Sequence, residues 1–118
     1  MLEKRIDEVS GGERTLVLLA RVLVGRPAVI IVDEPVAELD PAYQIQVMQI
    51  LKEEAGRGAL VLTTMHDIHL TQRFCEDVLL MKEGRILKSG SAAQIITKEN
   101  LAEVFEIPFA ERQELYAQ

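Results

Sequence analysis

The sequence predicts an α/β fold in which helices flank a sheet with parallel strands, and three features support this prediction. First, residues 28–32 and 59–64 are β-branched, apolar runs without polar alternation, which is typical of strands covered on both faces by helices. Second, segments with helical spacing separate the strands. Third, 118 residues are enough to bury roughly two thirds of the unfolded surface, but only as one domain.

The first predicted helix begins at Ser10, because Ser at a helix cap and Glu13 three residues later form a capping box. It ends near Gly25, and its interior is apolar around most of its circumference, so we expect it to be largely buried. The remaining predicted elements are a strand at 28–32, a helix at 41–55, a strand at 59–64, a short helix at 67–75, a hairpin of strands at 78–81 and 85–88, and helices at 92–96 and 98–105.

Composition excludes several classes of protein. The formal net charge of -6 has the wrong sign for a protein that holds nucleic acid or anionic lipid by its net field. The longest purely apolar runs are five residues, against about 20 for a membrane-spanning helix. One cysteine, Cys75, cannot form an internal disulfide, and the acidic N-terminus does not read as a secretory signal, so a cytoplasmic protein is expected.

Acidic and imidazole side chains follow the two predicted parallel strands. Asp33 and Glu34 end the first strand, and His66 follows the second. Ligands of open α/β sheets gather beyond the carboxyl ends of the strands, so these three side chains are expected at one edge. A carboxylate beside Mg²⁺, a second one that orients water and a side chain near a terminal phosphate suit phosphoryl transfer to water. No Gly-x-x-x-x-Gly-Lys-Ser/Thr phosphate cradle occurs in the sequence.

Each of these features also has a plainer interpretation. Asp33 and Glu34 could serve only as a cap or turn after a strand, and a single His66 is more often an ordinary surface residue. The pattern from Ser10 to Glu13 is fully explained as a capping box. The joint order and spacing of the three features is what favours the functional interpretation.

That order resembles the ATP-binding subunits of ABC transporters over nearly the whole chain. The matching motifs are a signature motif at 9–13, a Walker B strand at 29–33, the catalytic glutamate at Glu34, a D-loop at 36–40 and the switch histidine at His66. Departures are few: Thr15, Leu16 and Ala37 stand where many members carry Gln, Arg, and Ser or Thr. The resemblance implies the P-loop-NTPase-like fold of ABC ATPases, with the N-terminal half and its Walker A motif missing.

The resemblance also assigns a role to each motif residue. Asp33 would hold Mg²⁺, Glu34 would orient or deprotonate the attacking water, and His66 would contact the γ-phosphate of ATP. The signature residues would bind the γ-phosphate of the ATP held by a second ATP-binding subunit, and Asp40 would act across the same dimer interface. The signature residues are Ser10, Gly11, Gly12 and Glu13.

The resemblance therefore implies that residues 1–118 are the C-terminal part of an ABC ATP-binding domain, without a second domain. The expected function is part of the ATP-hydrolysing subunit of an importer, most like those for iron-siderophore, haem or cobalamin. Its expected partners are a second ATP-binding subunit and a membrane-spanning permease, which would hold it at the inner face of the cell membrane. ATP and Mg²⁺ would bind tightly only with the missing half, so the isolated chain is predicted not to hydrolyse ATP.

Two other functions remain open from the sequence. The chain could be a non-catalytic interaction or regulatory fragment, or a truncated gene product. It could also be a lobe of a DNA-handling ABC-type ATPase, but the absence of a heptad arm and of a basic face argues against that and against nucleic-acid binding. The resemblance places the P-loop strand in mid-sheet, so its absence leaves two open strand edges, and self-association is expected.

Overall fold

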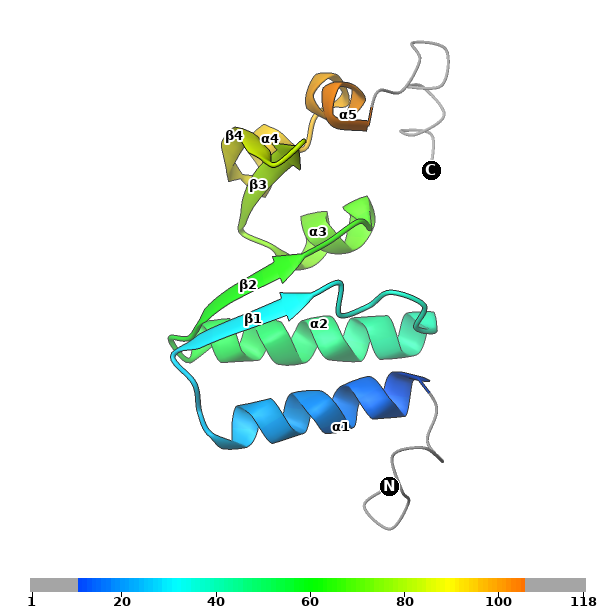
Figure 1. The fold of residues 1–118 in the computed structure, drawn as a ribbon, viewed down its shortest axis with the longest axis vertical. Helices are drawn as coiled ribbons and strands as arrows, with labels where there is room; N and C mark the ends of the chain where they lie inside the picture. Colours follow the sequence, from blue (N-terminus) through cyan, green and yellow to red (C-terminus); the bar gives the residue numbers. More distant parts are fainter. Residues whose placement is uncertain (1–10, 106–118) are drawn as a thin grey trace. The chain divides into compact units, whose positions relative to one another are not determined.

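The computed structural model describes residues 11–105, and these fall into two compact units that divide between His66 and Asp67 (Figure 1). Every helix and strand predicted from the sequence is present, with small shifts at the ends. The prediction of a single domain stays a prediction. The elements are α1 (Gly11–Val24), β1 (Val29–Asp33), α2 (Pro41–Gly56), β2 (Leu60–Thr64), α3 (Ile68–Phe74), β3 (Asp77–Lys82), β4 (Arg85–Ser91), α4 (Ala92–Ile95) and α5 (Lys98–Phe105).

The first unit consists of a two-stranded parallel sheet and two helices. β1 and β2 pair with Val29 opposite Leu60 and Asp33 opposite Thr64, as the parallel sheet predicted from the sequence requires. Helix α2 contacts the sheet and α1 contacts α2, so that α2 lies between α1 and the sheet (Figure 1). The buried side chains of this layer are Leu19, Ile30, Val36, Val47, Met48 and Leu51.

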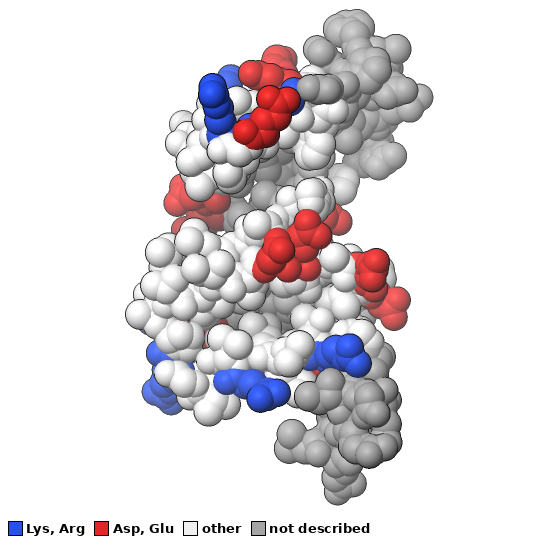
Figure 2. Space-filling view, viewed as in Figure 1, with Lys and Arg blue, Asp and Glu red and all other residues white. Residues whose placement is uncertain are grey.

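The expectation that both faces of this sheet are covered is wrong for the described residues. Ile30 is only 1% exposed, because alternate residues of a strand point to opposite faces and its face is the covered one. The other face exposes apolar side chains, and Figure 2 shows few charges over this part of the unit. These side chains are Val29 (50% exposed), Ile31 (76%), Leu60 (55%) and Leu62 (45%).

The expectation that the first helix is largely buried is also wrong. Within α1 only Gly12 and Leu19 are buried, and three apolar side chains, Leu18, Val22 and Val24, are exposed. The reason is that, among the described helices and strands, α1 packs mainly on α2, and one such contact covers only one stripe of a helix. The sequence of α1 therefore carries more apolar surface than the described part of the chain buries.

The second unit is built around the β3–β4 hairpin. The two strands are antiparallel, and the two turn residues, Glu83 and Gly84, both have positive φ (52° and 77°), as the predicted tight hairpin turn requires. Helices α3, α4 and α5 contact this hairpin or one another. Asn100, a buried polar residue, donates to the carbonyl oxygen of Ile95 at 2.8 Å. The core of this unit is formed by Val78, Ala92, Ile95, Ile96 and Leu101.

The four strands found among residues 11–105 form two two-stranded sheets, β1–β2 in the first unit and β3–β4 in the second. The expectation that a strand between β2 and β3 is missing stays a prediction. Within the described part of the chain each of these strands pairs with one neighbour, so its other edge has no strand partner there. None of the helices among residues 11–105 is long and apolar enough to cross a membrane.

Candidate functional site

Four residues meet at the carboxyl ends of β1 and β2. The Thr64 hydroxyl donates to Oδ1 of Asp33 at 2.5 Å, and it accepts the backbone N–H of Glu34 at 2.7 Å. Nε2 of His66 lies 2.6 Å from Oε1 of Glu34. Acidic side chains gather near these strand ends in Figure 2. The three residues predicted to share this edge, Asp33, Glu34 and His66, are thus brought together by the parallel pairing of two strands.

The backbone turns sharply where β1 ends. Glu34 has a φ of 46°, in the left-handed region that few residues other than glycine adopt. Its carbonyl oxygen accepts the N–H of Ala37 at 3.2 Å, which closes the first turn of the loop that leads to α2. Val36, buried in this loop, accepts a hydrogen bond from the Gln44 side chain of α2 at 3.3 Å. The loop is therefore tied to the helix that follows it.

The donor set suits a magnesium ion that keeps most of its water. No group of three or more His, Cys, Asp or Glu side chains that could hold a metal ion occurs among residues 11–105. Mg²⁺ usually binds through one or two carboxylates, waters and substrate phosphates and does not need a protein cage. Thr64 occupies only one of the lone pairs of Asp33, because a carboxylate offers about four. Asp33 can therefore also accept a hydrogen bond from a metal-bound water.

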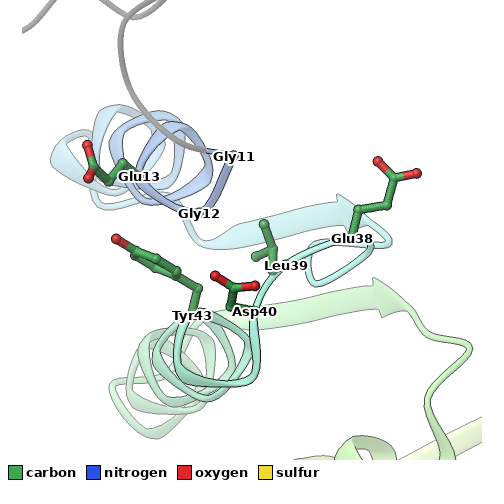
Figure 3. A pocket seen from close by; sticks show the side chains of 7 residues that line it. All are labelled: Gly11, Gly12, Glu13, Glu38, Leu39, Asp40 and Tyr43. Carbon is green, nitrogen blue, oxygen red and sulfur yellow. The ribbon is translucent and has the colours of Figure 1, made fainter.

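A second group of predicted site residues lines a pocket of about 270 Å³ between the start of α1 and the loop before α2. Figure 3 shows Leu39, Asp40 and Tyr43 projecting toward the start of α1, while the carboxylate of Glu38 points away. The lining residues are Gly11, Gly12, Glu13, Glu38, Leu39, Asp40 and Tyr43. The motifs that resemble a signature and a D-loop, separated by two elements in the sequence, are thus neighbours in the fold.

Asp40 occupies the N-cap position of α2, and Pro41 follows it. Its side chain makes no capping hydrogen bond, whereas the equivalent residue of α3, Asp67, accepts the N–H of Leu70 at 2.9 Å. Asp40 is an exposed residue. A plain capping role does not account for this carboxylate, which leaves it available to a binding partner.

The predicted site residues therefore form two groups within the first unit. Asp33, Glu34 and His66 form the first, and Gly11, Gly12, Glu13 and Asp40 belong to the second. No described hydrogen bond or ion pair joins the two groups among residues 11–105. Ser10 lies outside the described residues, so its predicted role and the capping box with Glu13 stay predictions.

Two residues of these groups were not predicted from the sequence. Thr64 was assigned only as the end of a strand, and Tyr43 only as part of a helix. A possible signal for Thr64 was its position, since a polar residue at the carboxyl end of a parallel strand lies beside the end of its neighbour. Nothing in the local sequence pattern distinguished Tyr43.

Comparison with known proteins is consistent with this geometry. A family model described as "ABC transporter" matches residues 1–37, which include α1, β1 and the Asp33-Glu34 pair. The chain is 39% identical over 107 residues to the hemin import ATP-binding protein HmuV of Rhizobium johnstonii, covering 84% of this chain and 40% of that protein. It is 38% identical over 114 residues to HmuV of Bordetella avium, covering 88% and 43%. The chain thus spans about two fifths of the length of these curated relatives.

Solved structures show the same relationship. A metal-chelate type ABC transporter in an inward-facing conformation superposes with a TM-score of 0.81 and 30% identity, covering 89% of this chain and 42% of that one. CbiO1 of Clostridium perfringens, part of the ABC transporter complex CbiONQ, has a TM-score of 0.71 and 28% identity, covering 98% and 46%. The chain is therefore related to the ATP-binding subunits of ABC transporters and shares the P-loop-NTPase fold of their ATPase domains.

Proposed function

We propose that this chain is part of the ATP-hydrolysing subunit that powers an ABC importer. The observation that carries the proposal is the contact of 2.6 Å between His66 and Glu34, beside Asp33, at the carboxyl edge of a parallel sheet. Hydrolysis of ATP needs a positioned water and stabilisation of charge on the phosphoryl group rather than covalent chemistry. An imidazole, a carboxylate and a second carboxylate for Mg²⁺ at one edge are groups that can meet these needs.

Each of the three residues has a distinct part in this proposal. Asp33 would hold Mg²⁺ through water, and Mg²⁺ would neutralise charge on the phosphates of ATP. Glu34 would orient the attacking water and accept its proton, and its side chain, which is 43% exposed, is accessible to water. His66, 74% exposed and in contact with Glu34, would face the γ-phosphate. Both side chains are therefore accessible to a substrate.

The second group of residues would serve a neighbouring ATP-binding subunit. Gly11 and Gly12 begin α1, where unpaired backbone N–H groups and the positive end of the helix dipole favour an anion. We propose that this end, with Ser10 and Glu13, binds the γ-phosphate of the ATP held by that subunit. Asp40, which lines the adjoining pocket, would contact the same subunit. The active assembly would then be a dimer of ATP-binding subunits.

The substrate class of the importer is proposed from its relatives. The similar curated proteins are hemin import ATP-binding proteins, and one similar structure is a metal-chelate type transporter. We propose an importer of haem or of a related metal chelate, such as an iron-siderophore or a cobalamin. A membrane permease would contact the substrate and would hold this subunit at the inner face of the cell membrane.

The experiment is Glu34→Gln in a complete subunit that contains this sequence, with steady-state phosphate release measured against ATP concentration. Gln is nearly isosteric but cannot accept a proton from water, so kcat should fall at least about a hundredfold while the ATP affinity stays unchanged. Glu53→Gln, on the exposed side of α2, is the matched control and should retain full turnover. Full turnover in Glu34→Gln would contradict the proposed role and leave Glu34 as a turn residue.

A further inference from the structure

The hydroxyl of Thr64 joins both acidic residues at the end of β1. It accepts the Glu34 N–H at 2.7 Å and donates its own proton to Oδ1 of Asp33 at 2.5 Å. A threonine hydroxyl has one proton to donate and two lone pairs, so one side chain fixes a backbone donor and a carboxylate acceptor at the same time. The partners lie 30 and 31 residues away in the sequence. This bonding is therefore tertiary and is not a local turn.

The bond to the Glu34 N–H bears on a backbone conformation that is otherwise unfavourable. A non-glycine residue in the left-handed region persists only when its surroundings hold it there. Glu34 is held on both sides, since its N–H is bound by Thr64 and its carbonyl oxygen accepts from Ala37 at 3.2 Å. The direction in which the Glu34 side chain leaves the strand, toward His66, follows from that backbone conformation.

Thr63 gives a contrast within the same strand. Its hydroxyl makes only local contacts, with the carbonyl oxygen of Thr64 at 3.3 Å and with Sδ of Met65 at 3.8 Å. Threonine is common in strands for its β-branched shape alone, and Thr63 fits that explanation. The same explanation does not account for Thr64, whose hydroxyl accepts from the N–H of Glu34 and donates to the carboxylate of Asp33.

We propose that Thr64 is a positioning residue, which orients the Asp33 carboxylate and holds Glu34 in the conformation that presents its side chain to His66. This inference rests on the proposed function for its catalytic consequence, but the positioning itself can be measured without ATP. Thr64→Val removes the hydroxyl while keeping the branched shape. Thr64→Ser keeps the hydroxyl, and Thr63→Val removes a hydroxyl from the neighbouring residue, so these two variants serve as controls.

The first measurement is hydrogen exchange of the Glu34 backbone amide by NMR, in the 118-residue chain without nucleotide. Loss of a hydrogen bond of typical net strength should make this amide exchange about fivefold to tenfold faster in Thr64→Val. Exchange in Thr64→Ser and Thr63→Val should stay within about twofold of the original chain. Unchanged exchange at Glu34 in Thr64→Val overturns the proposal. A general loosening would speed exchange in the core of α2 as well, and that outcome also counts against a specific positioning role.

The second measurement is ATP turnover in a complete subunit that contains this sequence. We expect Thr64→Val to lower kcat about tenfold or more with the KM for ATP within about twofold, since orientation and not binding is lost. Thr64→Ser should recover most of the kcat. Faster amide exchange with unchanged kcat overturns the catalytic consequence. If the complete subunit shows no ATPase activity at all, the proposed function fails, while amide exchange still decides whether Thr64 positions Glu34.

Discussion

The ring of Tyr43 lies directly against Gly12, in the space that a Cβ atom at position 12 would occupy. Gly12 is buried in the first turn of α1, and Tyr43 projects toward it from the first turn of α2 (Figure 3). The absence of a side chain at Gly12 therefore lets the two helix ends approach each other. The sequence explained this glycine only by its proposed contact with a phosphate, and the structure adds a packing reason.

Gly12→Ala should destabilise the chain. The added Cβ would overlap three atoms of the Tyr43 ring, and overpacking of this kind costs about 1 to 3 kcal/mol. The overlap is with atoms of a rigid ring, so we expect a cost in the upper part of this range, above the gain of about 1 kcal/mol that alanine has over glycine within a helix. Urea unfolding of the 118-residue chain, followed by circular dichroism, measures the change in the free energy of unfolding.

Two variants separate packing from other effects of this substitution. Gly11→Ala should change the stability little, because among residues 11–105 its Cβ would meet only Leu39, at an ordinary 4.0 Å. In a Tyr43→Ala background, Gly12→Ala should become neutral or slightly stabilising, since the overlapping ring is gone. Equal destabilisation by Gly12→Ala in both backgrounds would mean that Tyr43 is not the cause.

His66→Ala should lower ATP turnover in a complete subunit by about a hundredfold. The substitution removes a group that contacts Glu34 at 2.6 Å and a proposed partner of the γ-phosphate, and loss of one such electrostatic contact has an effect of this size. Phosphate release under saturating ATP measures it. His69, exposed on α3, is the other histidine of the sequence, and His69→Ala is the control with expected full turnover. Equal loss in both variants would argue against a specific role of His66.

The isolated 118-residue chain should neither bind ATP tightly nor hydrolyse it. Its sequence has no Gly-rich phosphate cradle with a lysine, which supplies most phosphate contacts in related sites. Titration with a fluorescent ATP analogue and a phosphate-release assay on the purified chain test this expectation, with a complete subunit as the positive control. Saturable binding at micromolar concentration, or steady turnover, would refute it.

The isolated chain should also self-associate through the apolar face of the β1–β2 sheet. That face exposes Val29, Ile31, Leu60 and Leu62, and the strands beside it have unpaired edges. Size-exclusion chromatography with light scattering over a concentration series should show a dimer or larger species. Ile31→Lys should shift the equilibrium toward monomer, because a charge would be buried in the contact.

The control for self-association is Val24→Lys, because Val24 is 84% exposed and lies on α1, which is separated from the sheet by α2 (Figure 1). This variant should associate as the original chain does. A monodisperse monomer of the original chain at high concentration, with one cooperative unfolding transition, would show instead that the chain covers this face by itself.

Local sequence patterns were sufficient to predict the helices and strands, and to predict that Asp33, Glu34 and His66 lie at the same edge of the sheet. β-branched runs, Pro and Gly at helix ends and the Glu83-Gly84 turn act over a few residues, so the sequence alone determines where each helix and strand lies. The parallel pairing that joins the three site residues also follows from a rule about strand ends, because consecutive parallel strands end at the same edge.

Only the tertiary structure decided the contacts that depend on distant residues. The two hydrogen bonds of the Thr64 hydroxyl depend on the register of β2 against β1. The approach of Tyr43 to Gly12 depends on how closely α1 and α2 pack. The same holds for burial, since an apolar run shows that a surface prefers to be covered but not which neighbour is present to cover it. Ile30 and Ile31 are adjacent and chemically identical, yet one is 1% exposed and the other 76%, because α2 packs on only one face of the β1–β2 sheet.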